Sequence, residues 1–407
     1  MLWLYNFGIS LYSLIVRLVA PFNPKAKLFV LGRQKTFEAV HQQIDQKTKH
    51  IWFHFASLGE FEQGRPVLEK IKQNHPEKPI VVTFFSPSGF EIRKNYPLAA
   101  GVFYLPLDTR KNAERFINAI NPELAVFTKY EFWHHYFQTL RDRQIPLFLI
   151  SGIFRQEQIF FKNYGGFYRN ILKNVTYFFV QNQESVELLN SIGINQARIA
   201  GDTRFDRVFQ STEQPLAVQE VADFCAGHKV FLGGSTWLPD EQLIATLANE
   251  NPDWKFILAP HEIHSEHLDQ IQKLIPQALR YSKLKTNKEL KSQVLVIDNI
   301  GMLSALYQYA DIAYIGGGFG AGIHNTLEAA AFGKPVLFGP NYHKFQEAKD
   351  LLQLGAARSI SNAAELKKGF EQLKMDSTAG SLARSYVADK KGATETIYEE
   401  IDRYFSL

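Results

Sequence analysis

The sequence predicts an α/β protein of two domains, each built around a parallel sheet with helices on both faces. Its 407 residues are enough for two or three domains. Short apolar runs alternate with amphipathic stretches along most of the chain, which is typical of βαβ units. Hydrophobic residues make up 45% of the chain, so there is ample material for two cores. This composition excludes a disordered chain, a coiled coil and a collagen-like fibre.

The N-terminal segment is expected to be a membrane-associated helix. Residues 2–16 carry no charge, and their apolar side chains recur at helical spacing. The stretch is short for a spanning helix, which needs ~20 apolar residues. No basic region precedes it and no small-residue cleavage site follows, so a secretory signal is not expected. The opposite side of the helix and the residues after it are polar or basic: Asn6, Ser10, Ser13, Arg17, Lys25, Lys27, Arg33 and Lys35. This pattern favours a segment lying in, or dipping into, the cytoplasmic leaflet, with an ordinary buried first helix as the alternative.

Ten strand candidates follow, about five on each side of residue 205. They are residues 50–55, 80–85, 124–128, 147–150, 177–181, 230–233, 255–259, 294–297, 312–315 and 335–338. Helical patterns separate many of them, so two Rossmann-like domains are expected. We place the membrane-associated segment at 1–22, the first domain at 23–206, a linker at 207–228, the second domain at 229–390 and a C-terminal helix at 391–407.

Charge and cysteine content restrict the partners and the compartment. Residues 1–200 hold 24 Lys and Arg against 15 Asp and Glu, whereas residues 201–407 hold 21 against 26. The basic half suggests an anionic partner or surface, although an uneven surface charge without function is the alternative. The single cysteine, Cys225, excludes an internal disulfide framework and a cysteine-rich zinc site. Because thiols stay reduced in the cytoplasm, most of the chain is expected to face it.

Carboxylates follow two of the predicted strands, at the sheet edge where α/β proteins bind ligands. The strand at 50–55 leads into Ser57-Leu58-Gly59-Glu60, where Glu60 could act as a general base if burial raises its pKa. On local spacing alone a capping box at the start of a helix is the favoured interpretation. The strand at 124–128 leads to Glu131 among aromatic residues, which alone says little.

A glycine-rich loop, residues 316–320, follows the strand at 312–315 and precedes a short helical pattern. Glycines at such a point let a phosphate approach backbone N–H groups. Asn325 and Glu328 lie three residues apart just beyond the loop, a pairing that suits a nucleotide sugar, with helix capping by Asn325 as the alternative. The twelve histidines contain no H-E-x-x-H motif, so no metal site is expected.

Taken in order, these motifs resemble the 3-deoxy-D-manno-octulosonic acid (Kdo) transferases of lipopolysaccharide synthesis. The resemblance runs along nearly the whole chain, beginning with the N-terminal apolar segment. The motifs that carry it are Trp52-Phe53-His54 with Ser57-x-Gly59-Glu60, Val82-Thr83 with Pro87-Ser88-Gly89, Tyr104-Leu105-Pro106-Leu107-Asp108, Tyr130-Glu131-Phe132-Trp133, Gly201-Asp202-Thr203-Arg204-Phe205-Asp206, Gly234-Ser235-Thr236-Trp237, Asp298-Asn299-Ile300-Gly301-Met302-Leu303 and Gly322-Ile323-His324-Asn325-Thr326-Leu327-Glu328.

The resemblance implies a GT-B fold, in which two Rossmann-like domains face a central cleft. It implies an inverting transfer of Kdo from CMP-Kdo to a hydroxyl of the lipid A precursor, lipid IVA. In that family the equivalent of Glu60 is the general base, and the equivalents of Glu131 and Arg204 act near the transition state. The family's CMP contacts fall on Pro260, His261, Ile300, Gly301, Met302, Asn325, Thr326, Leu327 and Glu328.

Four residues depart from the family pattern. His261 replaces an Arg, so contact with the donor phosphate is expected to be weaker and pH-dependent. Met302 replaces a Glu, which removes any hydrogen bond made by that side chain. Arg204 replaces a Lys and keeps its charge, and Thr326 replaces a Pro.

The expected partners follow from the same resemblance. They are CMP-Kdo, the lipid A precursor and an anionic membrane surface, with no cofactor, no metal and no nucleic acid. The expected location is the inner (cytoplasmic) membrane, with the catalytic domains on the cytoplasmic face. Packing of the C-terminal helix on the first domain is an analogy with GT-B folds. Two alternatives stay open: another GT-B nucleotide-sugar transferase or epimerase, and a lipid A binding or scaffold protein without enzymatic activity.

Overall fold

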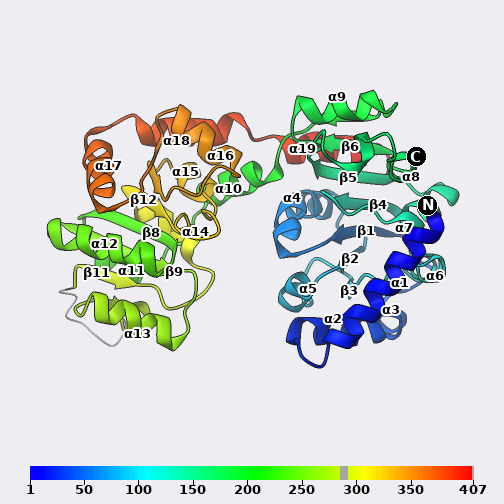
Figure 1. Cartoon of the computed structure of the whole chain (residues 1–407), viewed down its shortest axis with the longest axis horizontal. Helices are drawn as coiled ribbons and strands as arrows, with labels where there is room; N and C mark the ends of the chain where they lie inside the picture. The colour runs from blue at the N-terminus through cyan, green and yellow to red at the C-terminus, as the bar shows by residue number, and fades with distance from the viewer. Residues whose placement is uncertain (285–291, 406–407) are drawn as a thin grey trace. The chain divides into compact units, whose positions relative to one another are not determined.

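The computed structural model describes residues 1–284 and 292–405, which form two α/β units (Figure 1). The first unit comprises residues 1–206 and the chain from 392 onward, and the second unit comprises residues 207–391. Each unit contains a seven-stranded sheet, and every paired strand in both sheets is parallel. These two sheets confirm the predicted fold class.

The sheet of the first unit has the strand order β3-β2-β1-β4-β5-β6-β7. Its strands are β1 (His50–Phe55), β2 (Ile80–Phe84), β3 (Gly101–Tyr104), β4 (Pro122–Thr128), β5 (Leu147–Gly152), β6 (Tyr177–Val180) and β7 (Ala197–Ile199). All six residues of β1 are buried, as expected for a central strand covered on both faces. The chain runs outward from β1 to β3 and then returns to β4 on the other side of β1. The switch point of this sheet therefore lies between β1 and β4.

The sheet of the second unit has the order β10-β11-β9-β8-β12-β13-β14. Its strands are β8 (Lys229–Thr236), β9 (Trp254–Pro260), β10 (Leu279–Arg280), β11 (Val294–Val296), β12 (Ile312–Ile315), β13 (Val336–Phe338) and β14 (Ala357–Ser359). The corresponding switch point lies between β8 and β12, and this is where a ligand is expected in an open α/β sheet.

Helices cover both faces of each sheet. In the first unit they are α1 (Leu2–Val19), α2 (Pro24–Gln34), α3 (Thr36–Gln43), α4 (Leu58–Asn74), α5 (Pro87–Arg93), α6 (Arg110–Ile120), α7 (His134–Asp142), α8 (Gly166–Leu172), α9 (Gln183–Ser191) and α19 (Ala393–Asp402). The helix α10 (Thr203–Glu213) joins the two units, and the second unit adds α11 (Gln219–Cys225), α12 (Leu238–Glu250), α13 (Ser265–Leu274), α14 (Leu303–Leu306), α15 (Leu327–Ala331), α16 (Gln346–Gln353), α17 (Ala363–Met375) and α18 (Ala379–Asp389). Residues 207–228, predicted as a linker, thus contain most of α10 and all of α11, and they belong to the second unit.

Successive residues of β1 pack into two different cores. Trp52 joins a cluster with α3, α6, α7, α8 and α9 on one face of the sheet. Ile51, Phe53 and Phe55 join the cluster with α4 and α19 on the other face. This alternation follows from the two-residue period of a strand, and it places the side chain of His54 on the Trp52 side.

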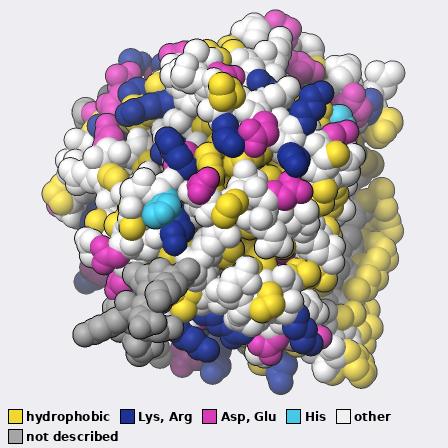
Figure 2. Space-filling model, turned by 90° about the vertical axis from the view of Figure 1, so that its left-hand side faces the viewer, with side chains coloured by type: hydrophobic (Ala, Val, Ile, Leu, Met, Phe, Trp, Pro, Cys, Tyr) yellow, Lys and Arg dark blue, Asp and Glu magenta, His cyan; other side chains and the backbone are white. Residues whose placement is uncertain are grey.

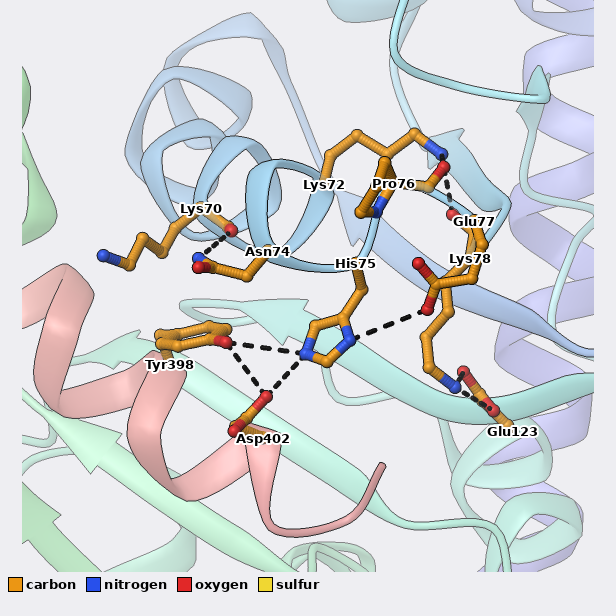
Figure 3. A network of polar contacts seen from close by, with 10 residues as sticks. All are labelled: Lys70, Lys72, Asn74, His75, Pro76, Glu77, Lys78, Glu123, Tyr398 and Asp402. Carbon is orange, nitrogen blue, oxygen red and sulfur yellow. Dashed lines mark hydrogen bonds and ion pairs between the residues drawn. The ribbon is translucent and has the colours of Figure 1, made fainter. Parts of the chain in front are cut away.

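The C-terminal helix α19 packs against α4 in the first unit (Figure 3). His75, just after α4, lies 2.6 Å from an Asp402 carboxylate oxygen through its Nε2 atom. The Tyr398 hydroxyl donates a hydrogen bond to the same carboxylate at 3.0 Å. At the other end of α19, the Asp206 carboxylate accepts hydrogen bonds from the backbone N–H groups of Gly392 and Thr394. The return of the chain is therefore held at both ends of the helix.

The first helix, α1, is attached to the first unit by its polar stripe. The Tyr5 hydroxyl donates a 2.5 Å hydrogen bond to Asp108, and Asn6 Oδ1 lies 2.7 Å from His135 Nε2. Among the described residues α1 is the one helix long and apolar enough to cross a membrane, and none of its residues is buried. Its apolar side chains are exposed: Leu2, Trp3, Leu4, Phe7, Leu11, Leu14, Ile15, Leu18 and Val19.

Candidate functional site

Glu60 lies in the first turn of α4, directly after β1. Ser57 occupies the N-cap position, but its side chain makes no capping hydrogen bond. The Glu60 Oε2 atom instead accepts a 2.6 Å hydrogen bond from the backbone N–H of Ala56. The reciprocal capping box that the local spacing favoured is therefore not formed.

The Glu60 carboxyl group titrates near neutrality. Burial, and then the negative charge of Glu131, raise its pKa to about 7. The Ala56 hydrogen bond and the positive charge of Lys129 oppose this rise without cancelling it. A carboxylate with such a pKa can accept a proton at physiological pH and is well matched to general-base catalysis.

Glu131 follows β4, on the other side of the same switch point. The chain turns sharply before it, because Lys129 has a positive φ of 59°, a conformation that is uncommon outside glycine. The Glu131 Oε2 atom lies 3.2 Å from His54 Nε2 and accepts a 2.9 Å hydrogen bond from Trp133 Nε1. Its side chain is 14% exposed. Two side chains thus hold the Glu131 carboxylate in place at the end of β4, which is more order than packing at the edge of the core requires.

Arg204 lies at the start of α10, beside the same helix that carries Glu60. The hydroxyl of its neighbour Thr203 donates a hydrogen bond to the backbone oxygen of Gln63 in α4. The Arg204 Nε atom donates to Asp202 at 2.8 Å, and the Arg204 side chain is 35% exposed. The ion pair with Asp202 positions a permanent cation at this edge of the first unit.

The second unit has a pocket of about 350 Å³ at the switch point between β8 and β12. Four of the residues predicted to bind the donor line it: His261, Gly301, Asn325 and Glu328. The predictions omitted other residues of its lining, namely Arg207, Ser235, Leu303, Ser304, Tyr307, Ile315 and His324. Ser235 and His324 fall within motifs that carry the family resemblance, so their position after β8 and β12 could have indicated them. The sequence offers no comparable signal for Ser304 or Tyr307.

The remaining predicted donor residues do not line this pocket. Leu327 and Thr326 are fully buried, and Ile300 is 87% exposed. Pro260 ends β9, and the Met302 sulfur lies 2.7 Å from Asn299 Nδ2. Their assignment to donor binding therefore stays a prediction.

Three aromatic rings stack beside the pocket. The rings of Trp237 and His261 have centroids 4.9 Å apart, and those of His261 and His324 are 4.3 Å apart. Trp237 Nε1 donates a 3.2 Å hydrogen bond to His324 Nε2. Burial, and then the proximity of His261, lower the pKa of His324. A neutral His324 can accept this hydrogen bond, and the stack fixes the imidazole of His261 at the pocket wall.

Four N–H groups in and beside the glycine loop have partners within the protein. The N–H of Gly317 donates to the buried carboxylate of Asp240 at 2.9 Å, and those of Gly316, Gly320 and Gly322 donate to backbone oxygens. Gly316 also permits close packing, since a Cβ there would lie 2.3 Å from the backbone oxygen of Ser235. A phosphate site at this loop stays a prediction.

Asn325 makes local contacts in the structure. Its Oδ1 atom accepts a hydrogen bond from the Leu327 N–H at 3.0 Å, and its Nδ2 atom donates to Glu328 at 3.2 Å. The N-cap of α15 is Thr326, so Asn325 contacts the start of the helix from one residue before the cap position, and it also makes the predicted pairing to Glu328. Figure 2 shows the face of the second unit that lies on the left of Figure 1, where basic and acidic side chains are interspersed rather than gathered in one patch.

Residues 1–284 and 292–405 contain no candidate cluster of metal ligands. No group of three or more His, Cys, Asp or Glu side chains there could hold a metal ion.

Two Rossmann-like sheets, with carboxylates after β1 and β4 in one and a polar pocket at the β8–β12 switch in the other, define a GT-B protein. A solved UDP-GlcNAc 2-epimerase from Neisseria meningitidis, bound to UDP-GlcNAc, has this fold. It superimposes with a TM-score of 0.61 at 16% sequence identity, covering 87% of this chain and 100% of the epimerase.

Sequence comparisons find similarity to Kdo transferases. A family model described as 3-deoxy-D-manno-octulosonic-acid transferase (kdotransferase) matches residues 32–207. A 3-deoxy-D-manno-octulosonic acid transferase of Rickettsia bellii is 26% identical over 372 residues, covering 88% of this chain and 87% of that protein. A bifunctional glycosyltransferase/methyltransferase of Fusobacterium nucleatum is 23% identical over 89% of this chain, which spans 59% of that protein's length. These matches agree with the predicted resemblance to the Kdo transferases.

Proposed function

We propose that this protein transfers Kdo from CMP-Kdo to a hydroxyl of the lipid A precursor, lipid IVA, in lipopolysaccharide core synthesis. Sequence similarity to Kdo transferases supports Kdo transfer as the reaction. The observation that carries the mechanism is Glu60, whose pKa of about 7 suits a general base. The donor, the acceptor and the stereochemical course are parts of the proposal.

In the proposed reaction Glu60 takes the proton from the acceptor hydroxyl as its oxygen attacks the anomeric carbon of Kdo. The new C–O bond forms as the bond to the CMP phosphate breaks, so the configuration at the anomeric carbon is inverted. Glu131 contributes negative charge, which favours the positive charge that develops on the sugar in the transition state. Arg204 stabilises the departing phosphate as a cation that stays charged at every relevant pH.

The second unit holds the donor in the proposed reaction. His261, Gly301, Asn325 and Glu328 line the pocket, and the other predicted donor contacts are Pro260, Ile300, Met302, Thr326 and Leu327. The leaving group is a nucleoside monophosphate, so no metal is needed to neutralise a diphosphate. Metal independence and the lack of a cofactor are part of the proposal.

The first unit binds a lipid acceptor at the cytoplasmic face of the inner membrane. The support is the exposed apolar surface of α1 together with basic residues close behind it, which suits an anionic leaflet. Tyr5 and Asn6 tie α1 to Asp108 and His135 along the side of the unit. These contacts favour a helix that lies against the membrane over one that crosses it.

A turnover assay with generated CMP-Kdo and a bisphosphorylated lipid A precursor tests the proposal, with products analysed by mass. We expect added Kdo masses with the wild-type protein. Glu60→Gln should lose ~10²–10⁴-fold in rate, the usual effect of losing a general base, while CMP binding is retained. Turnover of Glu60→Gln near the wild-type rate would contradict the role of Glu60.

A binding control separates the donor from the reaction. CMP is expected to bind in preference to UDP and GDP. CMP binding without Kdo transfer would keep the donor site but point to another sugar or acceptor. Binding of UDP in preference to CMP would contradict the proposed donor and favour another nucleotide-sugar enzyme.

A further inference from the structure

His54 is a buried histidine that lies next to the proposed catalytic carboxylates and has no role in the reaction described above. It stands near the end of β1, and its side chain is fully buried. The ring of Phe127, on the neighbouring strand β4, packs against it with a centroid distance of 4.8 Å. A polar ring at such a depth needs hydrogen-bond partners for both of its nitrogens.

Both ring nitrogens of His54 have a partner. Nδ1 lies 2.8 Å from the Thr83 hydroxyl on β2, the strand residue directly opposite His54. Nε2 lies 3.2 Å from Glu131 Oε2. Thr83 is fixed in turn, because Trp52 Nε1 donates to its hydroxyl oxygen at 2.8 Å. A continuous row of hydrogen bonds thus leads from Trp52 through Thr83 and His54 to Glu131.

The protons of this row are determined by its chemistry. Burial is the main cause that lowers the pKa of His54, and the positive charge of Arg33 adds to it, against the opposing effect of Glu131. A neutral imidazole has one donor and one acceptor nitrogen. A carboxylate can only accept, so Nε2 carries the proton and Nδ1 is an acceptor. The single Thr83 hydroxyl proton has two acceptors within reach, Nδ1 at 2.8 Å and the Phe53 backbone oxygen at 3.3 Å, and we assign it to the nearer Nδ1.

We infer that His54 is a positioning residue, whose Nε2–H group fixes the place of the Glu131 carboxylate beside Glu60. The catalytic consequence rests on the proposed function, whereas the hydrogen bond and its effect on ionisation do not. Trp133 Nε1 donates to the same oxygen at 2.9 Å, so two donors fix Oε2. Hydrogen bonds to a charged group are among the stronger ones in proteins.

The two carboxylates titrate as a pair, because the charge of Glu131 is one cause of the raised pKa of Glu60. Among the described residues, charged groups that also act here are Lys129, which acts on Glu60, and Arg33, which acts on His54 and interacts with Glu131. The proposed mechanism needs both carboxylates ionised. Loss of the His54 donor makes the doubly ionised pair less stable, so its upper apparent pKa should rise.

Two variants of His54 separate positioning from packing. In His54→Gln the side-chain amide nitrogen can take the place of Nε2 and donate to Glu131. In His54→Asn the amide reaches only as far as Nδ1, so the Thr83 contact remains possible and the Glu131 donor is lost. We expect His54→Asn to lose ~10–100-fold in kcat, as for one hydrogen bond to a charged group. The acid limb of its pH–rate profile should move to higher pH. In His54→Gln, kcat and the acid limb should both stay close to their wild-type values.

Nuclear magnetic resonance tests the inference without requiring turnover. In ¹⁵N-histidine-labelled protein, the signals absent from His54→Asn identify His54, which should be the neutral Nε2–H form at neutral pH and should not titrate as an exposed histidine does. In ¹³C-carboxyl-labelled protein, the upper apparent pKa of the pair should rise in His54→Asn and in Trp133→Phe, but not in His54→Gln. Thermal unfolding and CMP binding check that each variant is folded.

The results distinguish this inference from the proposed function. A His54 signal that titrates as an exposed histidine, or an equal carboxyl titration in His54→Asn and His54→Gln, would overturn the positioning role. If the variants shift the carboxyl titration as expected while the wild type transfers no Kdo, the positioning role stands and the proposed reaction fails.

Discussion

Both sheets are parallel and reverse their strand order at a central switch point, but their outer strand orders differ, and the two switch points present different chemistry. In the first unit the strands that flank the switch point, β1 and β4, lead to Glu60 and Glu131, whose carboxylates are held by hydrogen bonds. In the second unit the equivalent strands, β8 and β12, lead to Ser235 and His324 at the wall of a pocket. Parallel α/β topology therefore decides where a site lies, and the residues after the strands decide what the site does.

The energetics of the two sites differ as well. The first unit keeps two negative charges close together and partly buried, which raises the pKa of Glu60 to about 7. The second unit is shaped by stacked rings and by glycines packed against backbone. Changes in the first unit should therefore alter rate and pH dependence, and changes in the second unit should alter donor affinity.

Glu131→Gln should give the largest effect among variants that test this division. The substitution removes a negative charge and nearly preserves the shape of the side chain. We expect a ~10²-fold or greater loss in kcat, because charge placed near a transition state contributes strongly to rate. The acid limb of the pH–rate profile should also move to lower pH, since loss of the Glu131 charge lowers the pKa of Glu60.

Glu62→Gln is the matched control for Glu131→Gln, because Glu62 lies two residues from Glu60 on the same helix but pairs with Arg65 and Arg93. It should leave the acid limb in place. An unmoved acid limb in Glu131→Gln would contradict the coupling of the two carboxylates.

Gly316→Ala should weaken CMP binding by ~10–100-fold, as overpacking of a close backbone contact does. The new Cβ would meet the backbone oxygen of Ser235 at 2.3 Å and displace the pocket wall. Gly320→Ala, in the same loop, is the control, because its Cβ would have no neighbour closer than 3.7 Å. Calorimetric titration with CMP measures both variants. Equal affinity of the two would show that the wall at Ser235 does not contribute to donor binding.

His261→Arg should strengthen CMP binding by ~3–10-fold at about pH 8, where a histidine has lost its charge and an arginine has not. The gain should shrink as the pH falls. His264→Arg is the control, because His264 is exposed and does not line the pocket. If both variants gained equally, general electrostatic attraction would explain the result, and the assignment of His261 to the phosphate would be wrong.

Asp402→Asn should have the smallest effect, on stability alone. The His75 hydrogen bond is the main cause that lowers the pKa of Asp402. The ionised carboxylate therefore stabilises the folded chain above its unfolded pKa, and this contribution is lost as the pH falls through the folded pKa. Urea unfolding should show a loss of less than about 1 kcal/mol near neutral pH that disappears under acid conditions.

Glu77→Gln is the control for Asp402→Asn, because Glu77 lies 3.7 Å from the other nitrogen of His75. It should change stability less than Asp402→Asn does. A larger effect of Glu77→Gln would mean that Asp402 does not hold the end of α19.

The fold was largely predictable from the sequence, and the strands that were missed share one property. All ten predicted strands correspond to strands of the two sheets. The four that were not predicted, β3, β7, β10 and β14, are the edge strands of their sheets. They have two to four residues each, too few for a periodic pattern. Pairing with a single neighbour, rather than local sequence, defines them.

The sequence could predict those residues of the candidate site that come directly after a predicted strand. Glu60 and Glu131 could be found because each follows an apolar run. Spacing alone could not show that the Ser57 hydroxyl leaves the capping box unformed. It could not show that the buried Asp240 accepts a hydrogen bond from the N–H of Gly317 in the glycine loop. Nor could it show that His54 lies within hydrogen-bond distance of Glu131. These facts depend on contacts between residues far apart in the sequence.

The most direct test of the account is the pH dependence of kcat/KM for Kdo transfer by the wild-type protein and by Glu60→Gln. The account predicts an acid limb with an apparent pKa of about 7 in the wild type. This limb should be absent from the residual activity of Glu60→Gln. An acid limb at the same pH in Glu60→Gln would show that another group accepts the proton, and would contradict the assignment of Glu60 as the base.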